Sequence, residues 1–292
     1  MNWQTELNQS FSWLIMALIY ASCGLVISAY LIRQTPFGQK FWHITRPCWQ
    51  KANQPKAIVL ALLLLLMVLL EVRISVLNSF FYNGLYKSLQ DKDASAFWFF
   101  AGINALLVIT KIIHSILNYF LTQMVEIRWL ESLNKEMLLR WLNNKNYFRV
   151  QYEKELPDNI DQRIEQDATA FISGTIEMVR GVVNSVVATI EFTIILWGLS
   201  GILPLFGLEI PKGVVFFIYL FILIATTLSI WIGRPLINLN FNKEKLQGDY
   251  RYSLIRVRDN AESIAFYSGE EKEQTHLQHK FEAIIQNRWK IV

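Results

Sequence analysis

Residues 57–70 read AIVLALLLLLMVLL, fourteen apolar residues without interruption. As a helix rising 1.5 Å per residue, this run is about 21 Å long, which is shorter than the roughly 30 Å hydrocarbon core of a bilayer. The run crosses a membrane only if it continues through Glu71 and Arg73 to about residue 81. Because a charge facing lipid is costly, we expect these two side chains to face the protein interior or a watery cleft.

Four more apolar stretches lie on either side of this run, at residues 11–32, 97–119, 179–203 and 214–232. Each reaches or approaches the length of a membrane span. The first is kept as a span because it is too long for the core of a signal peptide and no basic residue precedes it. The composition agrees, since 18% of the residues are charged and a soluble domain carries about 25%. We therefore predict an all-α polytopic membrane protein with five spans.

The orientation follows from the lysines and arginines between the spans, which are enriched in cytoplasmic loops. Residues 33–56, 120–178 and 234–292 together hold 22 of the chain's 28 basic residues. The alternate loops, 82–96 and 204–213, hold three. We expect the amino terminus outside and the carboxyl terminus in the cytoplasm of a bacterial inner membrane.

The two large cytoplasmic segments have the patterns of helices. Residues 126–149 repeat apolar side chains every three or four positions, which predicts that the third span continues into the cytoplasm as an amphipathic helix. Residues 239–285 contain no proline and two glycines. They predict a long helix, a turn near Ser268 and Gly269, and a second helix.

Polar stripes run through two neighbouring spans. The first stripe consists of Asn104, Lys111, His114 and Asn118, and the second of Arg180, Asn184 and Glu191. Helical spacing places each set on one face. Lys111 and Glu191 lie at depths of about 12 and 18 Å, a gap within reach of a lysine side chain. The stripes line a translocation pathway, or Glu191 is a proton site. Alternatively, they form an interhelical ion pair that fixes packing, and the residues leave these interpretations open.

The chain shows no enzyme motif. No glycine is followed by lysine, so the phosphate-binding loop of an ATPase is absent. His276 and His279 lie three apart on a predicted helix without a third ligand nearby, and we expect a solvated helix face there and no metal site. The net charge of +4 is small, and no nucleic-acid partner is expected.

Each cytoplasmic segment carries a polar motif. The first motif consists of Asn159, Asp161, Gln162, Arg163, Ile164 and Asp167, and the second of Ala261, Glu262, Ile264, Ala265, Phe266, Tyr267 and Gly269. In type and order these residues resemble two motifs of the membrane domain shared by peroxisomal fatty-acyl ABC transporters and bacterial relatives of the YddA type. The SbmA/BacA peptide transporters are more distant kin. The resemblance covers roughly residues 57–292 and leaves the first span outside.

The resemblance implies a type-1, exporter-like ABC transmembrane domain with six spans and a carboxyl-terminal ATPase domain. This chain has four core spans and ends where the fifth is expected. We therefore interpret residues 1–56 as a leader helix with a basic loop. Residues 57–292 are interpreted as a partial transmembrane domain of a truncated or split subunit, with coupling regions at about 126–178 and 234–292. ATP and magnesium are expected on the ATPase domain, and no cofactor on this chain.

The family's cytoplasmic loops dock on ATPase domains, so the resemblance implies a structural and coupling role for both motifs. Asp161 and Arg163 are two residues apart and cannot pair along a helix, whereas Asp167 is correctly spaced to pair with Arg163. We interpret Phe266 and Tyr267 as packing anchors and not as ligand binders.

These features together predict the membrane-spanning part of an ATP-driven transporter for a hydrophobic or amphipathic substrate. The expected partners are the lipid bilayer, an ABC ATPase domain and a second copy of the chain in a homodimer. Two alternatives stay open. One is a proton-driven peptide transporter of the SbmA/BacA kind, which Glu191 and Lys111 favour, and the other is a non-functional remnant.

Overall fold

The computed structural model describes residues 3–46, 54–149, 163–205 and 208–291, which form two compact units, Met1–Gly198 and Leu199–Val292. The prediction of five spans is confirmed. The helices long and apolar enough to cross a membrane are Leu7–Arg33, Pro55–Gln90, Ala94–Arg149, Ile164–Leu199 and Gly213–Asp259. The run that begins at residue 57 thus lies in a helix that continues through Glu71 and Arg73.

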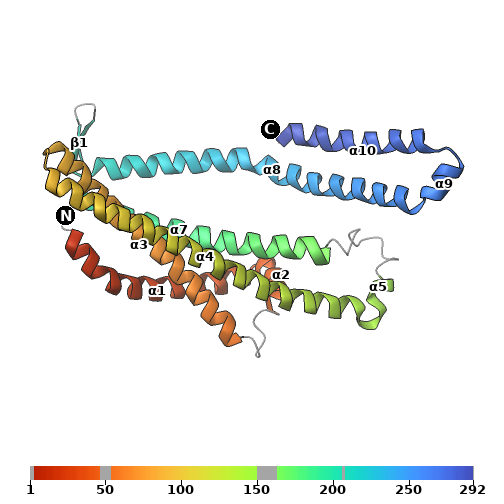
Figure 1. The fold of residues 1–292 in the computed structure, drawn as a ribbon, viewed down its shortest axis with the longest axis horizontal. Helices are drawn as coiled ribbons and strands as arrows, with labels where there is room; N and C mark the ends of the chain where they lie inside the picture. Colours follow the sequence, from red (N-terminus) through yellow and green to blue (C-terminus); the bar gives the residue numbers. More distant parts are fainter. Residues whose placement is uncertain (1–2, 47–53, 150–162, 206–207, 292) are drawn as a thin grey trace. The chain divides into compact units, whose positions relative to one another are not determined.

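The first unit is a bundle of long helices (Figure 1). Its elements are α1 (Trp3–Arg33), α2 (Pro36–Thr45), α3 (Gln54–Gln90), α4 (Ala94–Leu142), a 3₁₀ turn (Asn143–Lys145), α5 (Asn146–Arg149), a π turn (Arg163–Asp167) and α7 (Ala168–Leu199). Helix α3 packs against both α1 and α4. Its Leu69, Val72 and Val76 are at most 2% exposed, and this spacing of three and four residues puts them on one helical face. The apolar run therefore supplies the core of this unit.

Two apolar clusters hold α7 in the bundle. In the first, Leu64 of α3 meets Leu133 of α4 and Ile172 of α7. In the second, Leu69 of α3 meets Val183 of α7, and side chains of α1 cover both. Because the clusters lie at different levels along α7, they fix the helix along much of its length.

Helix α4 is 49 residues long, which confirms that the third span continues well beyond the apolar stretch. It begins at Asp93, whose carboxylate accepts hydrogen bonds from the backbone amides of Ala96 and Ser95 and from the Ser95 hydroxyl. The Ala96 amide and then the Ser95 hydroxyl hold the pKa of Asp93 below its ordinary value. The side chain thereby caps the helix.

The short helix α2 connects the end of α1 to the far part of α4 and to α7. Its Phe41 ring lies 5.6 Å from that of Phe171, and the Arg140 guanidinium donates to His43 Nε2 at 2.7 Å. Gly38 makes the sharp turn from α1 possible, because a Cβ atom there would lie 1.9 Å from the Ile32 carbonyl oxygen.

The second unit begins with a hairpin that the sequence did not predict. It consists of β1 (Ile202–Leu205) and β2 (Leu208–Pro211), paired antiparallel with Ile202 opposite Pro211. The expectation that the fourth span reaches residue 203 is therefore wrong at its end, since α7 stops at Leu199. Gly201 lies just after this end, and glycine is a poor helix former. Among the described residues, this hairpin is the single exception to an all-helical fold.

The rest of this unit is a helical hairpin of α8 (Gly213–Asp259), α9 (Ala261–Phe266) and α10 (Glu270–Ile291). Helix α8 passes through Pro235 without ending. The predicted long helix, turn and second helix are confirmed. Between α8 and α10, Asn287 donates to the Leu239 carbonyl at 2.9 Å, and the Tyr250 and Phe281 rings lie 5.6 Å apart.

Candidate functional site

A polar cluster lies within the spans of the first unit. Arg73 of α3 is 4% exposed, and its Nε donates to Ser10 Oγ of α1 at 3.0 Å. Its guanidinium carbon lies 5.4 Å from the centroid of the Trp13 ring, a cation–π distance. The Trp13 indole nitrogen donates to Glu191 Oε1 of α7 at 2.6 Å. One tryptophan thus bridges an arginine and a glutamate from two other helices.

The structure separates the two charges that interrupt the apolar run. Arg73 lies in the protein interior, as predicted, whereas Glu71 is exposed on the surface of its unit. Two residues correspond to about 200° of rotation around a helix, so the side chains point to nearly opposite faces. Glu71 does not face the interior of the first unit, so of the two predicted surroundings the watery cleft stays a prediction for it.

The polar stripe on α4 is only partly buried against the neighbouring helices. His114 Nε2 lies 2.9 Å from the Met67 carbonyl oxygen of α3, and Asn104 donates to the Phe100 carbonyl at 2.9 Å. His114, Asn104 and Asn118 are half-buried, but Lys111 is exposed. The structure shows no ion pair between Lys111 and Glu191, both of which it describes; Glu191 bonds to Trp13 instead.

The polar stripe on α7 contacts α4 at Arg180, which lies nearer the start of α7 than Glu191 does. Arg180 Nη1 donates to Thr122 Oγ1 at 3.1 Å, and Asn184 is half-buried nearby on the same helix face. Arg180 Nε and the side-chain oxygen of Asn118 are buried without a hydrogen-bond partner among the described residues. Polar groups left unpaired between spans cost stability unless water or another group meets them. The contact between α4 and α7 around Arg180 and Asn118 therefore suits a water molecule or another polar group.

The first polar motif falls mostly outside the described residues, which include neither Asn159 nor Asp161 nor Gln162. Its end, Arg163–Asp167, forms one π turn that leads into α7. The side chain of Arg163 is not described, so the pairing of Arg163 with Asp167 stays a prediction.

The second motif forms the tip of the helical hairpin. Phe266 and Tyr267 are 81% and 80% exposed, with ring centroids 5.2 Å apart in an edge-to-face contact. Glu262 is exposed on α9, and the Gly269 amide donates to the Ile264 carbonyl at 2.9 Å, which closes the turn. The prediction that Phe266 and Tyr267 anchor packing is wrong within this chain, because the rings contact each other at the surface.

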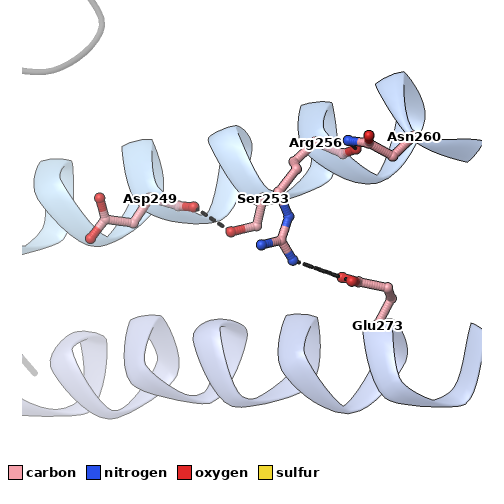
Figure 2. Close-up of polar contacts among 5 residues, drawn as sticks. All are labelled: Asp249, Ser253, Arg256, Asn260 and Glu273. Atoms are coloured by element: carbon pink, nitrogen blue, oxygen red, sulfur yellow. Dashed lines mark hydrogen bonds and ion pairs between the residues drawn. The ribbon is translucent and has the colours of Figure 1, made fainter. Parts of the chain in front are cut away.

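The base of this tip is fixed by side chains of α8 and α10 (Figure 2). Arg256 donates to both carboxylate oxygens of Glu273, at 3.0 and 3.3 Å, across the hairpin. Asn260 donates to the Arg256 carbonyl at 2.8 Å, and Ser253 to that of Asp249 at 2.9 Å. Sequence reasoning missed the Arg256 bridge and the role of Trp13. Arg256 and Glu273 are 17 positions apart in the sequence, so their pairing can be predicted only once the hairpin is assumed.

Comparison with known proteins places these features in a family. The family described as ABC transporter transmembrane region 2 matches residues 45–292. An uncharacterized ABC transporter ATP-binding protein of Haemophilus influenzae is 63% identical over all of this chain and 50% of its own length. The inner membrane ABC transporter ATP-binding protein YddA of Escherichia coli is 30% identical over 85% of this chain and 45% of its own.

A plant protein shows the same likeness. The chloroplastic ABC transporter D family member 2 of Arabidopsis thaliana is 30% identical over 85% of this chain and 34% of its own length. The chain spans about half the length of the Haemophilus relatives that it matches. With five helices that can cross a membrane and a family match over most of its residues, the chain belongs to the transmembrane region 2 family of ABC transporters.

Proposed function

We propose that this chain is the membrane-spanning part of an ATP-driven transporter that moves a hydrophobic or amphipathic substrate across a bacterial inner membrane. Its amino terminus lies outside, and two copies form a homodimer. ATP and magnesium bind to ATPase domains that these 292 residues do not contain. Relatives named as ATP-binding proteins and twice the length of this chain support such a partner.

The observation that carries the proposal is the exposed aromatic pair at the tip of the helical hairpin. Phe266 and Tyr267 offer large apolar surface to water, and such surfaces mark contacts with another protein. From Arg234, at the cytoplasmic end of the last span, to Asp259 the helix extends about 38 Å. That length lets the tip reach a partner well below the membrane.

The geometry of the hairpin suits the transmission of movement. The tip turn is closed by the Gly269 hydrogen bond to Ile264, and the Arg256 and Glu273 side chains join the two helices just behind it. A push on α9 therefore reaches α8, which is one continuous helix from the tip into the membrane. ATP-driven closure of the partner moves the span in this way.

The test replaces both tip aromatics, Phe266→Ala with Tyr267→Ala, in the complete transporter reconstituted in vesicles. We expect ATP-dependent transport to fall at least tenfold, while the thermal stability stays unchanged because neither ring is buried. Tyr252→Ala is the matched control, since Tyr252 is an exposed aromatic on the same hairpin at 60% exposure. Equal transport by the tip variant and the control would show that the tip is not the coupling contact.

A second candidate, proton-driven transport, is supported by one observation, the half-buried Glu191 carboxylate between spans. An intramembrane carboxylate is a candidate proton carrier. This mechanism predicts that uptake stops when the proton gradient is collapsed at constant ATP, and that Glu191→Gln has the same effect. Uptake that follows ATP and ignores the gradient rejects it.

A further inference from the structure

Helix α1 lies outside the family match, which begins at residue 45, although the two Haemophilus relatives match the chain over its whole length. It nevertheless packs on the bundle along its whole middle part. The inward side chains of α1 are Trp13, Leu14, Ala17, Leu18, Ala21 and Leu25. They cover Leu65, Val68 and Leu69 of α3 and Val183 and Val187 of α7. With this cover, Leu69 is 0% exposed.

The polar contacts of α1 fall on the two charged side chains of α3 and α7. Ser10 accepts from Arg73, the Trp13 ring lies against the same guanidinium, and the Trp13 indole donates to Glu191. An uncovered charge at this depth faces lipid, which is costly. Helix α1 therefore provides the contacts that Arg73 and Glu191 need in the membrane.

The apolar contacts between α1 and α7 follow the same pairing of residues as the hydrogen bond from Trp13 to Glu191. Helices α1 and α7 run in opposite directions (Figure 1), so the next turns bring Ala17 toward Val187 and Ala21 toward Val183. The polar contact and the apolar contacts thus belong to one continuous interface.

We propose that α1 is a fixed member of the transport bundle and that Trp13 is a positioning residue, which holds Glu191 of α7 and Arg73 of α3 so that α1, α3 and α7 move as one body during transport. The statement about movement rests on the proposed function. The statement that Trp13 joins the three helices does not.

The first test needs no transport and uses the purified chain in lipid nanodiscs. Trp13→Phe keeps the ring and removes the donor, and Glu191→Leu removes the acceptor. We expect each variant to lower the melting midpoint by about 2–6 °C. The double variant should lose clearly less than the sum, because each change leaves the other group without its partner.

Trp98→Phe, at an indole that is 73% exposed on α4, is the matched control and should add to Glu191→Leu without coupling. If Trp13→Phe and Glu191→Leu are also additive, Trp13 does not position Glu191 and the proposal is overturned.

The second test asks whether α1 and α7 move together. Ala17→Cys and Val187→Cys are introduced after Cys23 and Cys48, the two native cysteines, have been replaced by serine. In the complete transporter, the cross-linked and reduced forms should transport within about twofold of each other. Transport that stops on cross-linking and returns on reduction shows that α1 moves against α7, which overturns the common body.

The two tests separate the two ideas. If the cysteine-free transporter shows no ATP-dependent transport, the proposed function fails. The melting experiment still decides whether Trp13 joins the helices. Spin labels at residues 17 and 187 then decide the common movement, since a fixed α1 keeps their separation the same with and without nucleotide and a mobile α1 changes it.

Discussion

Each unit joins an arginine to a glutamate across two helices, but the two bridges differ in their surroundings. In the helical hairpin of the second unit Arg256 bonds directly to Glu273, and the two side chains are 45% and 27% exposed. In the membrane bundle Arg73 and Glu191 meet through the Trp13 ring and its indole N–H. Arg256 and Glu273 are exposed enough to hydrogen-bond to water. Arg73 and Glu191 have few groups other than those of the protein to bond to. The intramembrane bridge should therefore matter far more for stability.

The largest effect is expected at Arg73. Arg73→Ala removes a side chain that is 4% exposed, together with its contacts to Ser10 and Trp13, and should destabilise the bundle by about 2–5 kcal/mol. Thermal melting in detergent measures the loss. Arg73→Met is the control, because it keeps the length of the side chain and removes the buried charge.

If the methionine variant melts close to the native chain, the arginine contributes mainly packing. If it falls as far as the alanine variant, the charge itself is needed. An alanine variant that melts within 1 °C of the native chain would contradict the comparison between the two bridges.

The bridges also show what the sequence can predict. The five spans and the long hairpin follow from apolar runs and helical spacing, which are local properties of the chain. The Trp13 contact does not, because its partner is 178 residues away and nothing near Trp13 distinguishes it from the other nine tryptophans. Glu71 is exposed and Arg73 is buried because other helices cover only one face of α3, and tertiary packing decides which face that is.

The end of the fourth span was predicted wrongly for a related reason. Hydropathy continues past Leu199 through Ile202 and Leu203, so an apolar count extends the span. Gly201 and the pairing of β1 with β2 override that count, and the pairing depends on a partner strand that lies further along the chain. The exposure of Phe266 and Tyr267 was likewise missed, since large aromatic residues are usually buried for most of their surface.

A smaller effect is expected at the turns that connect helices in the two units. Gly38→Ala places a Cβ atom 1.9 Å from the Ile32 carbonyl oxygen, so the corner between α1 and α2 must shift, at a cost of about 1–3 kcal/mol. Gly269→Ala is the matched control, because its Cβ atom would lie 3.7 Å from Ile264. Thermal melting should detect the first change and miss the second.

Equal melting midpoints for the two glycine variants would mean that the corner at Gly38 yields without cost. A loss of transport in Gly269→Ala without a loss of stability would support the coupling role of the tip.

The smallest effect is expected at the Arg256 and Glu273 pair, which tests the comparison at its partly exposed bridge. A double-mutant cycle with Arg256→Ala and Glu273→Ala should give a coupling of about 0.2–1 kcal/mol, which salt lowers further because both groups are partly exposed. The pair Lys243 and Glu244, neighbours within α8 whose side chains are 35% and 67% exposed, is the reference for an ion pair that joins no second helix.

If the hairpin pair serves to hold the tip in position, breaking it should reduce ATP-dependent transport well beyond its effect on melting. Breaking the reference pair should leave transport unchanged. A coupling above about 2 kcal/mol would instead make the bridge between Arg256 and Glu273 as important for stability as the one through Trp13, and the contrast between exposed and buried arginine contacts would not hold for this chain.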